Sequence, residues 1–300
     1  MKKIGVIGLG NIAQKAYLPV MASLQDQFEW HLTTRNVDKG NKLVRQYGFT
    51  QHHQTLDELI AVHPLAVFVH TPTSTHAQII ERLLNENINV FVDKPVSDNF
   101  DDVVQLYDLA KAKGLLLTCG FNRRFAPFYD ELHGLVDKRI INVTKTREKV
   151  LQTPKDAIFD LAIHSVDTAL YLLGNQTIED VNSRVITDAD GNLAQHYLTL
   201  DTKMTRVNVT TNMESGVNLE QALVQTDSVC ESVTNLTTLD KIQSNSRQQF
   251  QRPDWESTLY SRGFEPMIKV FLDAVITNGA NPVSPESSIL THKICTDSCK

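Results

Sequence analysis

The sequence lacks the features of a membrane protein and of a nucleic-acid-binding protein. No apolar run approaches the roughly 18–20 residues that a membrane-spanning helix needs. Lysine and arginine number 29 against 35 aspartates and glutamates, a formal net charge of -6, and no Lys/Arg stripe offers a surface for phosphate backbones. The short apolar stretch at residues 4–9 is followed by no small-residue cleavage site, so we expect a cytoplasmic protein.

Cysteine is also scarce. The chain has four cysteines, at positions 119, 230, 295 and 299. Cys295 and Cys299 are four residues apart in a predicted helix, where a metal or redox pair is conceivable, but no further ligand cluster accompanies them. We therefore expect free thiols, which are usual in a reducing compartment, and no metal site.

Residues 1–120 are expected to form an α/β unit, a Rossmann dinucleotide-binding domain. Apolar runs such as Ala66-Val67-Phe68-Val69 do not alternate with polar residues, which is typical of a parallel sheet covered by helices on both faces. Thr55 and Glu58 have the spacing of a helix capping box. The predicted strands are 3–8, 28–33, 65–70, 89–92 and 115–119, and the predicted helices are 11–24, 37–47, 57–61, 74–85 and 100–113.

Residues 121–300 are expected to form a second, α+β domain for substrate binding and dimerisation. Several segments alternate apolar with polar residues, as Val207, Val209 and their neighbours do, which indicates a large, mainly antiparallel sheet with one solvated face. Strands are predicted at 140–150, 179–186, 195–202, 206–213, 222–227 and 232–239, and helices at 157–173 and from 259 onward. We leave open that the C-terminal helix packs back on the first domain.

The segment Gly8-Leu9-Gly10-Asn11-Ile12-Ala13 joins the first predicted strand to the first helix. In a dinucleotide site, Gly8 permits the tight turn, Gly10 lets the backbone approach a pyrophosphate, and Ala13 keeps the helix close to the strand. The free N–H groups at the helix start, from Asn11 and Ile12 on, then face the phosphate. A glycine-rich turn without a ligand is the alternative, and the place of the motif at the head of a βαβ series argues against it.

The end of the second predicted strand bears on the choice of cofactor. NAD-binding sites usually carry Asp or Glu there, for the ribose 2′-hydroxyl, whereas this chain has Thr33-Thr34-Arg35-Asn36. An arginine between hydroxyl and amide neighbours suits a 2′-phosphate, so we expect Thr34, Arg35 and Asn36 to favour NADP(H) over NAD(H). Asp38 is expected in the first turn of the next helix, where its charge suits the dipole.

Two further segments follow predicted parallel strands, at the edge where open α/β sheets bind their ligands. They are residues 71–76, Thr-Pro-Thr-Ser-Thr-His, and residues 93–95, Asp-Lys-Pro. The candidates to contact the cofactor are Thr71, Pro72, His76, Asp93 and Lys94. Lys94 would be a cation beside the cofactor, and a solvated loop lysine is the alternative.

On a predicted helix of the second domain, Asp160 and His164 are four residues apart and share a face. Apolar neighbours could place the pair in a partly buried pocket, where His164 relays a proton and Asp160 orients it. An exposed Asp–His pair is the alternative. A zinc site of paired helical histidines is not supported, because the second histidine is missing.

Together these segments resemble the Gfo/Idh/MocA family, which includes glucose–fructose oxidoreductase and inositol 2-dehydrogenase. Four motifs, Gly8–Ala13, Thr71-Pro72-x-x-x-His76, Asp93-Lys94-Pro95 and Asp160-x-x-x-His164, occur in the family's order and approximate spacing. The resemblance covers essentially the whole chain. Residues 120–127, Gly-Phe-Asn-Arg-Arg-Phe-Ala-Pro, and residues 12–16 are especially similar to the MviM-like branch. The family motif usually reads Glu-Lys-Pro, and Asp93 keeps its charge.

The resemblance implies an NAD(P)-dependent oxidoreductase that transfers a hydride between the nicotinamide and a sugar, sugar-acid or cyclic polyol. His164 would exchange the proton of the reacting hydroxyl, Lys94 would hydrogen-bond the same oxygen, and Asp160 would position the substrate or His164. Asn122, Arg123 and Arg124 would border the nicotinamide and the substrate, unless the two arginines pair with acidic residues of the second domain. A homodimer or homotetramer is also implied.

Two other functions remain open. One is a dinucleotide-binding regulator without turnover, against which Lys94, Asp160 and His164 argue, because a sensor needs no proton relay. The other is a reductase of a non-sugar compound, which the same fold also supports.

Overall fold

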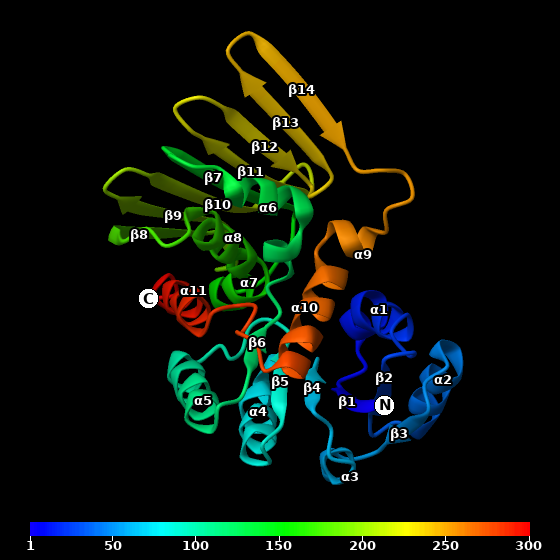
Figure 1. The fold of residues 1–300 in the computed structure, drawn as a ribbon. Coiled ribbons are helices and arrows are strands. Elements are labelled where there is room, and N and C mark those ends of the chain that lie inside the picture. The colour runs from blue at the N-terminus through cyan, green and yellow to red at the C-terminus, as the bar shows by residue number, and fades with distance from the viewer. The chain divides into compact units, whose positions relative to one another are not determined.

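The computed structural model describes residues 1–300, which divide into two compact units (Figure 1). The first unit comprises residues 1–120 and 264–289, and the second comprises residues 121–263 and 290–300. None of the helices has the length and apolar character that crossing a bilayer requires.

The first unit is built on a six-stranded sheet in which all paired strands run parallel, in the order β3-β2-β1-β4-β5-β6. This confirms the predicted doubly wound sheet. The chain order reverses between β1 and β4, and such a reversal opens a ligand crevice at the carboxyl ends of the strands. The strands are β1 (Lys2–Ile7), β2 (Phe28–Thr33), β3 (Gln51–His53), β4 (Ala66–Val69), β5 (Asn89–Val92) and β6 (Leu117–Cys119).

Local capping fixes where several helices of this unit begin. The Asn36 side chain accepts from the Lys39 N–H at 2.9 Å and starts α2, and Thr55 accepts from the Glu58 N–H at 3.1 Å and starts α3. The Glu58 carboxylate accepts from the Gln54 N–H, one residue before the position a capping box would use. The helices are η1 (Ala13–Tyr17), α1 (Leu18–Ala22), α2 (Val37–Tyr47), α3 (Leu56–Ala61), η2 (Thr73–Thr75), α4 (His76–Asn85), α5 (Phe100–Lys113) and α10 (Phe264–Thr277).

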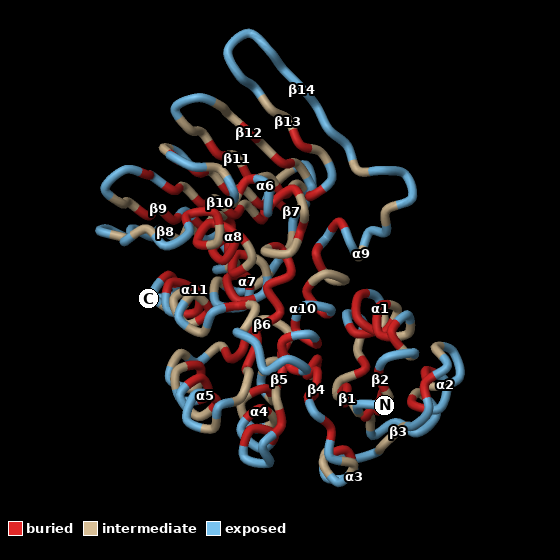
Figure 2. The backbone as a smooth tube through the Cα atoms, in the orientation of Figure 1, coloured by how far each residue is buried: buried red, intermediate tan, exposed pale blue.

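An aromatic cluster forms the centre of the first unit. Phe68 of β4 and Phe91 of β5 each lie 5.3 Å from the ring of Phe271 on α10. Tyr17 of η1 lies 5.5 Å from the ring of Phe264, at the start of α10. Of the four strands at the middle of the sheet, β2, β4 and β5 are buried along most of their length, and β1 along half of its length (Figure 2). Residues near the end of the chain therefore belong to the core of the first unit.

The second unit is built on an eight-stranded sheet in the order β14-β13-β12-β11-β7-β10-β9-β8. Only β7 and β10 pair in parallel, so the prediction of a large, mainly antiparallel sheet is confirmed. Helix α8 packs on β7 and β10, over the face to which Val207 and Val209 point. The strands are β7 (Ile140–Glu148), β8 (Ile178–Thr187), β9 (Leu193–Thr202), β10 (Arg206–Ser215), β11 (Leu219–Gln225), β12 (Cys230–Thr234), β13 (Thr238–Gln243) and β14 (Ser246–Gln251).

The predicted helix at 157–173 is three segments in the structure, with a π-helical turn in the middle. The helices of the second unit are η3 (Asn122–Phe125), α6 (Pro127–Gly134), α7 (Pro154–Ala157), the π-helical η4 (Ile158–Ala162), α8 (Ile163–Leu173) and α9 (Thr258–Ser261), and α11 (Pro285–Asp297) has residues in both units.

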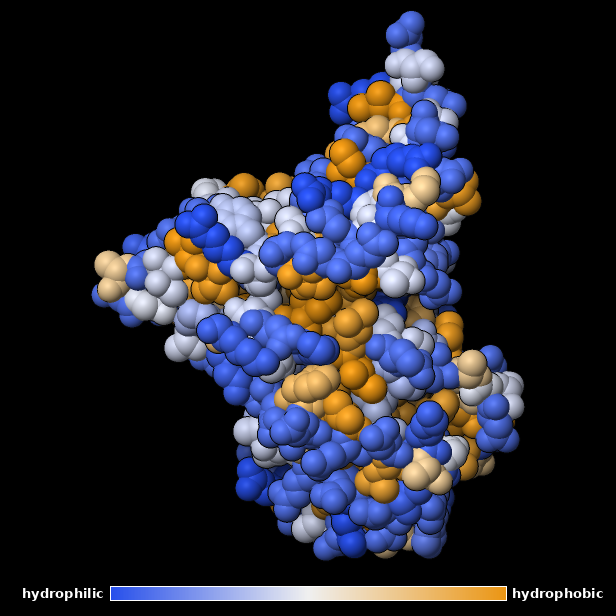
Figure 3. Space-filling view, turned by 90° about the vertical axis from the view of Figure 1, so that its left-hand side faces the viewer, coloured by the Kyte–Doolittle hydropathy of each residue, from blue (hydrophilic) through white to orange (hydrophobic).

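One predicted strand was wrong and two strands were missed. The segment 232–239 is not a single strand, because Asn235 and Leu236 both have left-handed backbones, with φ of 51° and 66°, and turn the chain from β12 into β13. Strand β3 has only three residues. Strand β14 is exposed along its whole length and carries no apolar alternation; its hairpin with β13 forms the mainly hydrophilic projection at the top of Figure 3.

Candidate functional site

The turn after β1 has the geometry that a dinucleotide requires. Gly8 has a φ of 91°, and an added Cβ there would overlap the backbone of His70 and Thr71. At Gly10 an added Cβ would meet no atom within 4 Å, so space stays open beside the backbone. Ala13 is fully buried, whereas Asn11 and Ile12 open the helix at the surface. This arrangement fits a pyrophosphate approaching the helix start.

A cleft of about 520 Å³ adjoins this turn. Five of the predicted cofactor residues line it: Gly8, Thr34, Arg35, Thr71 and Pro72. The remaining lining residues are Ile7, Thr33, Gln54, Thr55, Leu56, Thr75 and Ile79, which sequence reasoning missed. No carboxylate is among them. The residues present therefore fit a dinucleotide, and the cleft lacks the acidic group that would hold a ribose 2′-hydroxyl.

The backbone at the end of β2 is held from both sides. The Thr34 N–H donates to the His53 carbonyl at 3.0 Å, and the His52 ring lies 2.8 Å from the Thr34 carbonyl. Arg35 is exposed at the mouth of the cleft. Asn36 uses its carbonyl oxygen to cap α2, and Asp38 lies in the first turn of that helix, as predicted.

His76 and Asp93 have partners inside the first unit. The His76 ring lies 2.8 Å from both the Pro95 and the Thr71 carbonyls, so it links the two segments that follow β4 and β5. The Asp93 carboxylate accepts from the Lys94 N–H at 3.0 Å, and the Tyr17 hydroxyl lies 3.4 Å from it. Burial raises the pKa of Asp93, and the Lys94 cation opposes this. The hydrogen bonds of His76 and Asp93 thus fix the backbone on either side of Lys94.

His70, which the sequence did not single out, is buried beside this region. Its ring stacks on Tyr17 at 3.9 Å between centroids, and neither ring nitrogen has a hydrogen-bond partner. Burial, with a smaller contribution from His76, lowers the pKa of His70 to about 3. His70 is therefore a neutral, apolar packing group at neutral pH.

In the second unit, η4 and α8 carry Asp160 and His164. Asp160 is exposed, and its carboxylate accepts from the Gln152 amide at 3.2 Å. His164 is half-buried, and its ring contacts the Arg123 guanidinium: Nη1 lies 3.0 Å from Nδ1 and 3.2 Å from Nε2. Lys94 belongs to the first unit and these residues to the second.

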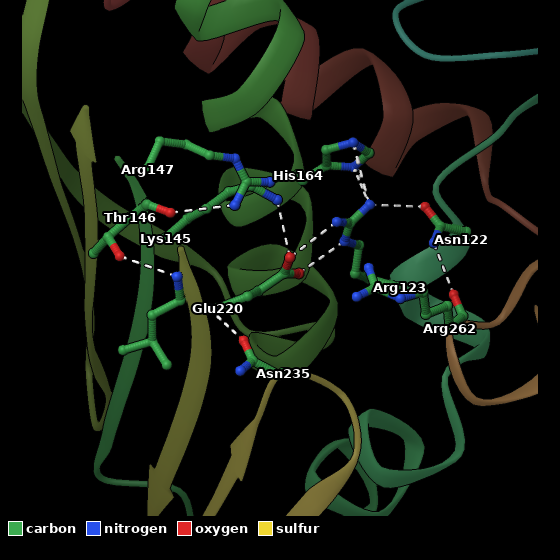
Figure 4. A network of polar contacts seen from close by, with 10 residues as sticks. Asn122, Arg123, Lys145, Thr146, Arg147, His164, Glu220, Asn235 and Arg262 are labelled. Carbon is green, nitrogen blue, oxygen red and sulfur yellow. Dashed lines mark hydrogen bonds and ion pairs between the residues drawn. The ribbon is translucent and has the colours of Figure 1, made fainter. Parts of the chain in front are cut away.

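Arg123 is part of a buried charge network (Figure 4). Its Nε and Nη2 donate to the two Glu220 oxygens at 2.8 and 2.9 Å, and Lys145 Nζ donates to the same carboxylate at 2.9 Å. Burial alone would raise the pKa of Glu220, but the two cations hold it well below its usual range. Burial and the Arg123 charge lower the pKa of Lys145 to about 7.

Asn122 and Arg124 complete the surroundings of Arg123. The Asn122 carbonyl oxygen accepts from Arg123 Nη1 at 3.0 Å, and its amide donates to the Arg262 carbonyl at 2.7 Å. Arg124 forms a separate ion pair with buried Asp167, at 2.6 Å. The sequence left open whether the two arginines border the substrate or pair with acidic residues, and in the structure each pairs with a carboxylate.

Glu220 and Lys145 are the residues of this network that the sequence did not point to. They are directly opposed across β11 and β7, and no local motif surrounds either of them. Elsewhere, the four cysteines form no disulfide, and no group of three or more His, Cys, Asp or Glu side chains could hold a metal ion.

Comparison with known proteins gives the class of the chain. The family model Gfo/Idh/MocA, described as an oxidoreductase family with an NAD-binding Rossmann fold, matches residues 2–121. The protein YceM of Salmonella typhimurium, whose name classes it among the oxidoreductases, is 31% identical over 302 residues, which cover 97% of this chain and 95% of YceM. A myo-inositol 2-dehydrogenase of Thermotoga maritima is 27% identical over 189 residues, 59% of this chain and 56% of that protein.

A solved structure agrees with these relatives. The dehydrogenase MviM of Clostridium difficile superposes with a TM-score of 0.93 at 30% identity, over 99% of this chain and 98% of that one. The fold, the cleft and these similarities define a Rossmann-fold oxidoreductase. The chain belongs to the Gfo/Idh/MocA family, which confirms the resemblance noted in the sequence.

The two glycines of the first turn should respond differently to alanine. We expect Gly8→Ala to destabilise the fold, because its Cβ meets backbone atoms at a left-handed φ. We expect Gly10→Ala to leave the melting temperature near that of the parent but to weaken NADPH binding at least about tenfold, since the methyl fills the space for the pyrophosphate. Thermal unfolding and fluorescence titration of NADPH measure the two effects. Unchanged NADPH affinity in Gly10→Ala would contradict the assignment of this turn.

Proposed function

We propose that the chain is an NAD(P)-dependent oxidoreductase that transfers a hydride between the nicotinamide and a CH–OH group of a sugar, sugar-acid or cyclic polyol. The observation that carries the proposal is the contact of His164 with the Arg123 guanidinium, in a chain whose first unit holds a dinucleotide-shaped cleft. A guanidinium cation beside the ring disfavours its protonated form, and the neutral form is the one that a general base needs. The myo-inositol 2-dehydrogenase relative supports a polyhydroxylated substrate.

The protein residues handle the proton and the charge on oxygen. When bound, the dinucleotide supplies the hydride acceptor or donor. His164 takes the hydroxyl proton during oxidation and returns it during reduction. Lys94 donates a hydrogen bond to the same oxygen and stabilises its developing negative charge, and Asp160 orients the substrate or His164.

We further propose that NADP(H) is preferred to NAD(H). Arg35 lies at the cleft, Thr34 beside it, and none of the lining residues is acidic. A guanidinium pairs well with a phosphate, and its geometry allows two parallel hydrogen bonds. Gly8, Thr71 and Pro72 line the cleft too, and Gly10, Asn11, Ile12 and Ala13 form the adjoining helix start; these residues would hold the rest of the dinucleotide.

Assembly and location complete the proposal. Four cysteines that form no disulfide suit a reducing compartment, and we propose the cytoplasm. One face of the large sheet presents half-exposed polar side chains such as Asn208 and Thr210, and we propose that the chain forms a homodimer or homotetramer. Sedimentation at the mass of one chain would contradict this.

Lys94→Met tests the proposed chemistry. We expect turnover of a responsive sugar, sugar-acid or inositol to fall at least about 100-fold, because a donor to the charged oxygen is lost, while NADPH affinity stays unchanged. Lys111→Met, on the exposed side of α5, is the matched control and should keep full turnover. Initial rates of NADPH formation or consumption measure both.

Two outcomes would overturn parts of this assignment. Full turnover in Lys94→Met removes Lys94 from the mechanism. Tight NADPH binding by the parent protein, with no turnover of any aldose, ketose, inositol or sugar acid, favours a dinucleotide-binding regulator instead.

Arg35→Asp tests the cofactor preference. We expect NADPH binding to weaken at least about tenfold more than NADH binding, since the carboxylate repels a 2′-phosphate and can accept from a 2′-hydroxyl. Arg45→Asp makes the same charge change in the last turn of α2 and should affect both cofactors alike. Equal losses for NADPH and NADH in Arg35→Asp would show that Arg35 does not read the 2′ position.

A further inference from the structure

The contact between Arg123 and His164 indicates that Arg123 acts on the reaction through His164. We propose that Arg123 is a positioning residue: fixed by Glu220, its guanidinium holds the His164 ring in place and keeps it in the neutral, proton-accepting form. This inference rests on the proposed function, in which His164 is the proton acceptor.

The geometry of the contact favours the neutral form of the His164 ring. Arg123 Nη1 lies 3.0 Å from His164 Nδ1 and 3.2 Å from Nε2, and a guanidinium has N–H donors but no acceptor. Because Nη1 is nearly equidistant from the two ring nitrogens, it lies over the face of the ring, and the in-plane lone pair of a neutral imidazole stays free to accept a proton. A protonated imidazole would place one cation against another at about 3 Å.

The Arg123 charge is permanent and its position is fixed. Arginine does not lose its proton in proteins, and although burial opposes the charge, Glu220 raises the pKa of Arg123. Three of its nitrogens are engaged: Nε and Nη2 by the two Glu220 oxygens, and Nη1 by the Asn122 oxygen as well as the His164 ring. Arg123 is 8% exposed. The guanidinium therefore has no freedom to turn away when His164 gains a proton.

The other charged groups near His164 in the second unit do not cancel this effect. Asp160, one helical turn earlier, favours a protonated ring, but it is exposed and accepts from Gln152. Glu220 lies on β11, and Lys145 and Arg147 lie on β7 (Figure 4). Arg124 is paired with Asp167. Arg123 contacts the ring directly, and charge interactions weaken with distance and screening.

Arg123→Gln separates this role from a structural one. The ring protons of His164 are followed by NMR against pH in the full-length protein, and His164→Asn identifies the signal among the 10 histidines. We expect the titration midpoint in Arg123→Gln to rise by about one pH unit or more, as loss of a neighbouring cation predicts. The acid limb of kcat/KM should move upward by the same amount.

Arg124→Gln is the matched control. It removes the cation of an equally buried ion pair at the next residue and should leave the His164 midpoint unchanged. If Arg123→Gln does not fold, Arg123→Lys carries the test: the shorter side chain keeps the charge near Glu220 but draws it away from the ring, so the midpoint must still rise.

An unchanged midpoint in the Arg123 variants, or an equal rise in Arg124→Gln, would overturn the inference. Because the NMR titration needs no substrate, it tests the role of Arg123 independently of the proposed function. A shifted midpoint with no turnover by the parent protein refutes the proposed function alone. Turnover with an unshifted midpoint refutes the role of Arg123 alone.

Discussion

The second unit depends on one buried carboxylate. Glu220 on β11 accepts from Arg123 on η3 and from Lys145 on β7, so it joins two strands of the sheet to the segment that follows β6. Removing one partner of a buried ion pair leaves the other charge uncompensated, typically at a cost of about 3–5 kcal/mol. Burial lowers the pKa of Lys145 to about 7, whereas Arg123 keeps its positive charge. That charge lies against His164, where it bears on the proton transfer we propose.

The first unit is constrained in a different way, by backbone proximity rather than by charge. Gly8 brings the turn after β1 against the backbone at His70 and Thr71, while Gly10 leaves space beside the start of the helix. His76 and Asp93 then fix the two segments that follow β4 and β5 by hydrogen bonds to backbone groups. In the proposed function, the first unit binds the dinucleotide and the second supplies the histidine. The proposed oxidoreductase needs both.

Local signals predicted the first unit well. The helices predicted at 37–47 and 100–113 have these bounds in the structure, and the continuous apolar strands indicated a parallel sheet. Errors arose where local signals are weak. A three-residue strand has too few residues for a pattern, and the turn at Asn235 and Leu236 uses non-glycine residues in a left-handed conformation. Strand β14 has one apolar residue, Phe250, and so shows no strand pattern.

The residues of the candidate site also differ in whether local sequence signals could identify them. Residues in contiguous motifs, such as Gly8, Arg35, Lys94 and His164, could be selected from the sequence. Glu220 could not, because it meets Arg123 across 97 positions and Lys145 across 75, and that meeting depends on the register of β11 against β7. A shift of one residue would turn Glu220 to the other face of the sheet. Only tertiary structure identifies such a partner.

We propose that the Glu220 network acts on the reaction through His164. A double-mutant cycle of Glu220→Gln and His164→Asn, measured as kcat/KM on a substrate that the parent protein turns over, tests it most directly. If the claim holds, Glu220→Gln lowers kcat/KM strongly in the parent protein and has little further effect once His164 is replaced. If the two losses simply multiply, Glu220 and His164 act independently and the claim is wrong.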